Sequence, residues 1–202
     1  MNSPDGEEGY PGNLEVTAEF TVEGRELRVQ FEAQSDAATP LNLTYHPYFN
    51  FAGDMRLRMP ASRFLPVKDS RMIPTGELVP VDGTPFDFRS ARSVVPPEPS
   101  THPQLDHGGG YDHCWVLDSP RDCDAELESV SSALRMTIRS DRPGIQFYGG
   151  QHLRAAHPGL SGICLEPEGL PNAVNMPAFP PCILEAGETL QSTFVYRFDE
   201  RV

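Results

Sequence analysis

Residues Leu14–Ala33 have the sequence LEVTAEFTVEGRELRVQFEA, and this stretch decides the fold class of the chain. Apolar side chains occupy every second position from Leu14 to Val22 and again from Leu27 to Ala33. Strict alternation is typical of half-buried strands, because successive side chains of a strand point to opposite faces. Glu23-Gly24 lies between the two runs and predicts a tight turn. We therefore predict a β-hairpin.

Shorter apolar runs of the same kind follow along the rest of the chain. They predict strands at residues 55–59, 64–67, 111–117, 126–130, 134–138, 145–148 and 190–198. No window of a dozen residues carries helical periodicity, and 21 prolines would interrupt most helices. Residues 1–12 are expected to form a loop, and residues 96–110 are the best candidate for a mobile loop. Many short strands between turn signals predict an all-β, antiparallel sandwich or barrel, with residues 1–202 as a single domain.

Composition narrows the class of partner. The net charge is −13, which argues against binding to nucleic acid or to an anionic membrane surface. The four cysteines lack the C-x-x-C spacing of a zinc or redox site, and Cys114 and Cys164 lie in apolar runs typical of buried thiols. Residues 1–12 do not have the pattern of a signal peptide, and no apolar run approaches membrane-spanning length. We expect a cytoplasmic protein.

Glu166 is the first candidate for a catalytic group. The apolar run Ile163–Leu165 predicts a buried strand, and Pro167 has no N–H for a strand ladder, so Glu166 is expected where the strand gives way to a loop. A carboxylate beside apolar side chains loses hydration, which raises its pKa toward that of a general base. The alternative is a solvated acid at a strand end.

Two further polar groups stand beside aromatic or glycine-rich segments. His46, just after a predicted strand and near Tyr48, Phe49 and Phe51, would titrate near neutral pH and suits proton transfer, and the rings could stack on a sugar. A structural histidine in an ordinary core is the alternative. Asp112 follows Gly108–Tyr111 and could accept hydrogen bonds from ligand hydroxyls, or could be a turn aspartate. A metal site of His107, Asp112 and His113 fits no standard zinc spacing.

Six segments, in order along the chain, together resemble the aldose 1-epimerase family, whose members are also called galactose mutarotases. Residues 42–51 (NLTYHPYFNF) resemble the family signature N-L-T-N-H-x-Y-F-N-L, with Tyr45 in place of the usual Asn. Residues 162–175 (GICLEPEGLPNAVN) resemble the segment of the catalytic glutamate, with Glu168 in place of the usual Gln. The other similar segments are residues 3–14, 73–89, 110–115 and 143–148.

The resemblance implies a galactose-mutarotase-like β-supersandwich and an isomerase that interconverts the α and β anomers of a free hexose. It places Glu166 on the catalytic base, His46 on the general acid and Asp112 on the sugar-binding aspartate. It also places Gln146 and Tyr148 on a strand near the sugar. The acid and base are expected to face each other across the sugar. No metal, nucleotide or other cofactor is implied.

Family members are longer, and this chain resembles only their C-terminal portion. The preceding portion supplies a sugar-binding arginine and a further histidine, whereas here no arginine or histidine precedes Arg25. The strands expected to be missing would leave edges and apolar faces exposed, so an N-terminal partner chain or self-association is predicted.

Three other functions stay open at this stage. The first is a non-catalytic sugar-binding protein of the same fold, or an inactive fragment. The second is a glycoside hydrolase that uses Asp112 and Glu166 as paired carboxylates. The third is an enzyme for phosphorylated sugars, which is disfavoured because no arginine cluster lies beside the motifs.

Overall fold

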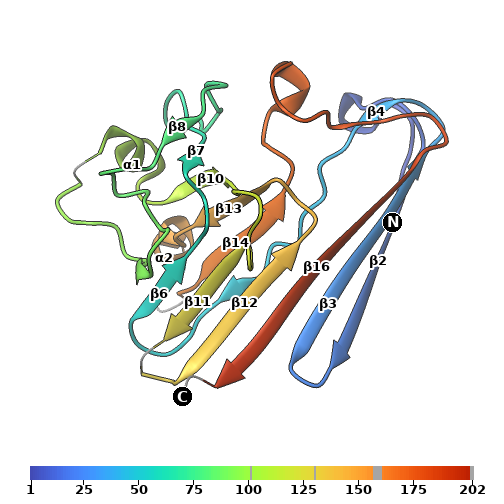
Figure 1. Cartoon of the computed structure of the whole chain (residues 1–202). Coiled ribbons are helices and arrows are strands. Elements are labelled where there is room, and N and C mark those ends of the chain that lie inside the picture. Colours follow the sequence, from blue (N-terminus) through green and yellow to red (C-terminus); the bar gives the residue numbers. More distant parts are fainter. Residues whose placement is uncertain (101, 130, 157–160, 201–202) are drawn as a thin grey trace.

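The computed structural model describes residues 1–100, 102–129, 131–156 and 161–200 of the chain. These residues form two large antiparallel sheets, and Figure 1 shows the long strands of the larger sheet running side by side. In spatial order the larger sheet contains β1 (Asn2–Ser3), β2 (Leu14–Glu23), β3 (Glu26–Ser35), β16 (Thr189–Glu200), β12 (Leu134–Ser140), β11 (Ala125–Ser129), β6 (Met55–Arg58) and β9 (Arg92–Ser93). The predicted all-β class is confirmed.

The smaller sheet lies across the larger one. Its strands, in spatial order, are β5 (Tyr48–Phe49), β14 (Ile163–Glu168), β13 (Gly144–Tyr148), β10 (Asp112–Val116), β7 (Arg63–Phe64) and β8 (Val79–Pro80). A separate pair of short strands consists of β4 (Thr39–Pro40) and β15 (Ile183–Leu184). The short helices are η1 (Glu7–Gly9), α1 (Pro103–Gly108), α2 (Gln151–Ala156) and η2 (Ala173–Asn175).

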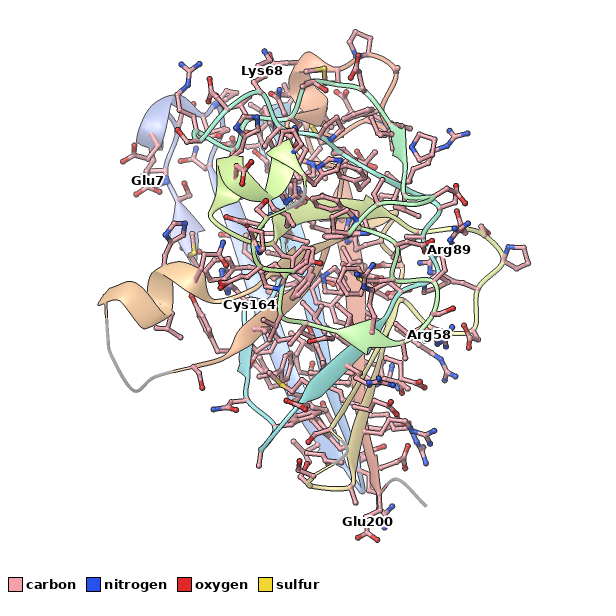
Figure 2. All side chains as sticks on the ribbon, turned by 90° about the vertical axis from the view of Figure 1, so that its left-hand side faces the viewer. Glu7, Arg58, Lys68, Arg89, Cys164 and Glu200 are labelled. Atoms are coloured by element: carbon pink, nitrogen blue, oxygen red, sulfur yellow. The ribbon has the colours of Figure 1, made fainter. Side chains whose placement is uncertain are left out.

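The core fills the space between the two large sheets. From the larger sheet come buried Leu57, Leu127, Met136, Ile138, Phe194 and Tyr196, and from the smaller sheet come Phe64, Trp115, Ile145, Phe147, Ile163 and Leu165. Buried aromatic rings need partners for their polar atoms, and Trp115 Nε1 donates to the Phe86 carbonyl oxygen at 2.8 Å. In Figure 2, Cys164 lies near the middle of the molecule, whereas Lys68, Arg89 and Glu200 lie at its edge. Because the two large sheets share one core between them, they form a sandwich.

The predicted hairpin is present, with its turn at Gly24–Arg25 rather than at Glu23-Gly24, since Glu23 and Glu26 are already paired. Gly24 has a φ of 58°, a left-handed conformation that glycine adopts without steric cost. The alternating apolar side chains of the two strands differ in how far they are buried. Val29 of β3 is fully buried, but Phe20 and Val22 of β2 are 53% and 74% exposed. β2 lies toward the far edge of the larger sheet (Figure 1), where the smaller sheet does not cover it.

Several local predictions were wrong. Residues 1–12 contain β1, which pairs with β2, rather than only a loop. Residues 96–110 contain α1, which is too short to show helical periodicity. Pro103 begins this helix, the His102 side chain caps it by accepting from the Gln104 N–H, and Gly109 ends it in a left-handed conformation. Helix α2 was also not predicted. No helix in the described ranges is long and apolar enough to span a membrane.

Candidate functional site

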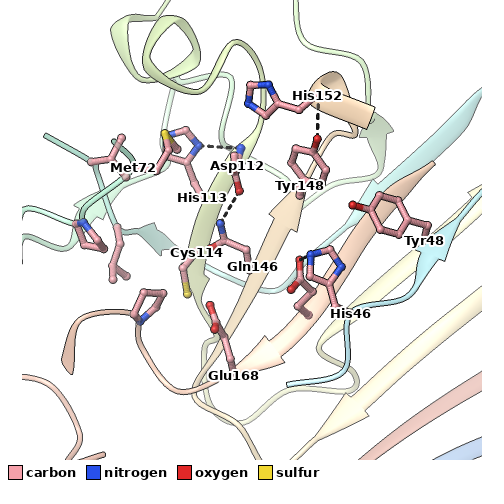
Figure 3. Close-up of a pocket in the computed structure, with 15 residues that line it drawn as sticks. His46, Tyr48, Met72, Asp112, His113, Cys114, Gln146, Tyr148, His152 and Glu168 are labelled. Carbon is pink, nitrogen blue, oxygen red and sulfur yellow. Dashed lines mark hydrogen bonds and ion pairs between the residues drawn. The ribbon is translucent and has the colours of Figure 1, made fainter. Parts of the chain in front are cut away.

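A cavity of about 490 Å³ opens on the face of the smaller sheet that points away from the core. Strands β10, β13 and β14 form its floor. The segment that ends at Tyr48 and helix α2 contribute to its wall, together with apolar side chains from residues 65–74. Figure 3 shows His46, Asp112, Gln146, Tyr148 and Glu168 around this space. The cavity is lined by all five residues predicted for the site, namely His46, Asp112, Gln146, Tyr148 and Glu166.

Strand pairing explains why residues distant in sequence meet here. One row across the sheet contains Tyr48, Cys164, Tyr148 and Asp112, and the next contains Glu166, Gln146 and Cys114. Side chains that are directly opposite on neighbouring strands lie within contact distance, so each row brings its polar groups together. The intervening residues point to the other face, where Trp115, Phe147 and Leu165 belong to the core. The sheet therefore has one apolar face and one polar face.

Glu166 lies inside β14, not at its end as predicted. It pairs with Gln146, and the strand continues through Pro167 to Glu168. β5 pairs with Ile163 and Cys164, and among the described residues no strand pairs with the edge of β14 beyond them. A proline at such a position removes no ladder hydrogen bond from that side. The Thr44 hydroxyl donates to the Pro167 carbonyl oxygen at 2.9 Å, which ties the chain near His46 to this edge.

Burial gives Glu166 the properties of a base that works near neutral pH. The residue is 6% exposed. Burial, followed by the nearby negative charge of Asp112, raises the pKa of Glu166 to about 7. His46 Nε2 lies 3.5 Å from Glu166 Oε1, and the His46 side chain is half exposed. Acid and base candidates therefore stand together on one wall of the cavity, not on opposite sides of it.

His46 lies in an irregular segment that precedes β5, whereas the sequence placed it after a strand. Its ring stacks on Tyr48 with centroids 5.3 Å apart. The Tyr48 ring in turn makes an edge contact with the Tyr148 ring. This aromatic group holds the imidazole beside Glu166 while one side of the ring stays open to solvent. Such a position suits a group that must exchange protons with a ligand.

Asp112 and Gln146 form a second polar pair. Gln146 Nε2 donates to Asp112 Oδ1 at 2.8 Å. Burial raises the pKa of Asp112, and this hydrogen bond acts in the opposite direction. The Tyr148 hydroxyl is already engaged, because it accepts from the backbone N–H groups of His152 and Leu153 in the first turn of α2. The hydroxyl oxygen therefore serves as an acceptor for the first turn of α2, and Tyr148 also lines the cavity.

The metal site considered from sequence is not formed by His107, Asp112 and His113. His113 is buried, its Nδ1 accepts from the Asp112 N–H, and burial lowers its pKa to about 3. Within the described residues, the donor atoms close enough to hold a metal belong to His46, Cys164 and Glu166, and all lie within 4.8 Å of one another. Burial raises the pKa of the Cys164 thiol to about 12, so it is protonated at neutral pH and is not poised as a metal ligand.

Sequence reasoning missed some of the residues that line the cavity. Met72 lines the cavity from a loop and His152 lines it from α2, and no local sequence pattern marks either residue. Glu168 was noted only as an unusual residue. Its position two residues after Glu166 was a usable signal, since alternate residues of one strand share a face. A strand that ends at Pro167 would place Glu168 in a loop, so the predicted strand end hides this signal.

The chain belongs to the aldose 1-epimerase family, whose sequence model matches residues 1–197. Galactose mutarotase of Homo sapiens is 41% identical over 97% of this chain, and aldose 1-epimerase of Escherichia coli strain K12 is 33% identical over 98% of it. Galactose 1-epimerase of Lactobacillus acidophilus NCFM has a similar structure, with a TM-score of 0.88 at 29% identity over 100% of this chain. The chain spans about 60% of the length of each relative, namely 60%, 62% and 62%.

Proposed function

We propose that this chain carries the catalytic groups of an aldose 1-epimerase, which interconverts the α and β anomers of a free hexose such as galactose or glucose. One observation carries the proposal. A buried carboxyl with its pKa near neutrality contacts a half-exposed imidazole inside a sugar-sized cavity. The relatives are named for this activity on galactose or aldoses.

In the proposed reaction, ionised Glu166 takes the proton from the anomeric hydroxyl, and protonated His46 donates a proton to the ring oxygen. The C1–ring oxygen bond breaks as the electron pair of the hydroxyl oxygen forms the aldehyde. Rotation about C1–C2 presents the other face of the aldehyde, and the ring closes with the two roles reversed. Both oxygens are bonded to C1, so two groups 3.5 Å apart can reach both of them.

The remaining polar groups support binding of the hydroxyls. We assign Asp112 and Gln146 to sugar binding, because their hydrogen-bonded pair lies next to Glu166 on the same face of the sheet. The rings of Tyr48 and Tyr148 give the sugar an apolar surface. No arginine or lysine is found among the described residues that line the cavity, which disfavours a phosphorylated sugar. A pairing of carboxyl with imidazole suits a hemiacetal better than a glycosidic bond.

The direct test is polarimetry with freshly dissolved α-galactose. Folded protein is expected to accelerate the decay of optical rotation, and kcat/KM should fall as the pH drops below about 7, because Glu166 is then protonated and cannot act as a base. The expected decrease is about tenfold per pH unit at the low end. Turnover that stays constant well below pH 7 would contradict the role of Glu166. If folded protein does not accelerate the decay at any pH, the chain would be a sugar-binding protein without turnover.

We also propose that the uncovered part of the larger sheet binds a further polypeptide: the part of the family fold that longer relatives contain and this chain does not match. A groove of about 950 Å³ lies along it, lined by apolar side chains that include Leu14, Val16 and Phe31. Phe20 and Val22 continue this apolar surface. β1 and Met1 bond this edge of β2 only as far as Val16, and no strand of the described residues pairs with the remainder of the edge.

Co-expression tests this interaction surface. The segment of Lactobacillus acidophilus galactose 1-epimerase that this chain does not match is expected to form a complex with it and to slow amide exchange in β2. Phe20→Asp should weaken the complex, because it buries a charge without a partner. Glu19→Gln, on the opposite face of β2, is the matched control. A chain that stays monomeric and exchanges rapidly beside the added segment would contradict the proposal, and self-association would assign the surface to a second copy.

The compartment is a further proposal. Cys114, Cys123, Cys164 and Cys182 are free thiols. Free thiols are typical of a reducing environment, which supports the expected location in the cytoplasm.

A further inference from the structure

Glu168 has no role in the reaction described above, although it lines the same cavity. It lies two residues after Glu166 on β14, so both side chains leave the same face of the sheet. The residue opposite Glu168 on β13 is Gly144. No side chain on that strand therefore stands between the Glu168 carboxyl and the cavity (Figure 3).

Packing around this row explains why the residue opposite Glu168 is a glycine. A Cβ atom at Gly144 would lie 2.9 Å from Cys114 Sγ and 3.0 Å from Leu170 Cδ2, too close for any other residue without movement. Asn42 fixes the other side of Glu168. Its Oδ1 accepts from the Gly169 N–H at 2.7 Å, and its Nδ2 donates to the Gly169 carbonyl oxygen at 3.0 Å. The backbone that carries Glu168 is thus held in place from both sides.

Three carboxyl groups in one cavity without an arginine or lysine in its described lining cannot all ionise at neutral pH. Asp112 receives a hydrogen bond from Gln146 and Glu166 contacts His46. From the described residues, Glu168 receives a long contact of 3.4 Å from Asn42 Nδ2, which is shared with Gly169. The least compensated carboxyl keeps its proton. The acidic and basic groups and the thiol that line the cavity with Glu168 are His46, Asp112, His113, Cys114, His152 and Glu166.

We propose that Glu168 is a sugar-binding residue of this site and that its neutral carboxyl donates a hydrogen bond to a sugar oxygen. The inference rests on the proposed function and extends it to a residue with no assigned role. Burial, followed by the charge of Glu166, raises the pKa of Glu168 to about 8, against the smaller opposing effect of the Asn42 hydrogen bond. Burial and the charge of Glu166 both favour the neutral form of the Glu168 carboxyl.

The pH dependence follows with a definite sign. Below about pH 8 Glu168 holds its proton and serves as a donor, and as the pH rises through that value the donor is lost. The sugar would then cover a carboxylate that has no cation beside it, which is unfavourable. Galactose should bind more weakly above pH 8. Because binding and protonation are linked, galactose binding just above pH 8 should take up protons from solution.

Calorimetric titration with galactose tests this with two variants. Glu168→Gln retains a neutral donor of the same shape, so it should bind as tightly as the original chain at pH 7, keep that affinity above pH 8, and take up no protons there. Glu168→Ala should bind about 3- to 10-fold more weakly at pH 7, the effect of one lost hydrogen bond. Titrations in buffers with different ionisation enthalpies give the proton count.

The outcomes separate the inference from the proposed function. If the original chain binds galactose but Glu168→Gln shows the same loss of affinity and the same proton uptake above pH 8, Glu168 is not the donor. Unchanged affinity in Glu168→Ala would overturn the role as well. If folded original chain and both variants all fail to bind galactose, the proposed function and this inference fall together. Circular dichroism of each variant establishes that it is folded.

Discussion

Glu166→Gln is expected to reduce the turnover of α-galactose by about 10² to 10⁴-fold and to leave galactose binding nearly unchanged. The amide has the shape of the carboxyl but cannot accept a proton from the anomeric hydroxyl. Backbone pairing with Gln146 does not depend on the side chain, so the strand should persist. Polarimetry measures turnover, and calorimetry on the same preparation measures binding.

The binding measurement distinguishes an enzyme from a non-catalytic sugar-binding protein. Loss of turnover with retained binding is the result expected of a catalytic base. Full turnover in Glu166→Gln would remove Glu166 from the mechanism. Glu19→Gln is a suitable control, since it makes the same chemical change on an exposed position of β2. The control should behave like the original chain in both measurements.

The fold class could be predicted from sequence because strand alternation is a local property. Leu14–Val22 and Leu27–Ala33 showed it without interruption, and each became one strand of the hairpin. Burial was harder to predict. Phe20 and Val29 are cross-strand neighbours with the same pattern, yet only Val29 is covered by the smaller sheet. Which part of a sheet is covered depends on how the sheets are placed, and that is not encoded within one strand.

The site shows the same division between local and long-range information. Glu166, His46 and Asp112 could be singled out by residue type and neighbours, and the structure brings all three to one cavity. Their arrangement depends on register. Pro167 suggested a strand end, but its effect depends on whether the adjacent strand edge is paired, and no strand in the described part of the chain pairs with that edge. Glu168 therefore joins the site because β14 continues through Pro167, which the expected strand end excluded.

His46→Ala is the second large expected effect, a decrease in turnover of about 10² to 10⁴-fold at neutral pH, because the ring oxygen loses its proton donor. Little stability should be lost. The His46 side chain is half exposed, and the residues that it contacts, Glu166 and Tyr48, are held independently by β14 and β5. A change in turnover without a change in the melting temperature would indicate a chemical role rather than a structural one.

Chemical rescue makes this prediction sharper. Since the removed ring was half exposed, added imidazole can diffuse into the space beside Glu166. It should restore part of the turnover of His46→Ala, after subtraction of the rate that imidazole produces without protein, and it should not restore Glu166→Gln, which lacks the base. The rescued rate should rise as imidazole becomes protonated and fall again when Glu166 takes up a proton below about pH 7. Equal rescue of both variants would show that the added imidazole does not depend on Glu166 as the base, and would leave His46 without the role of positioned acid.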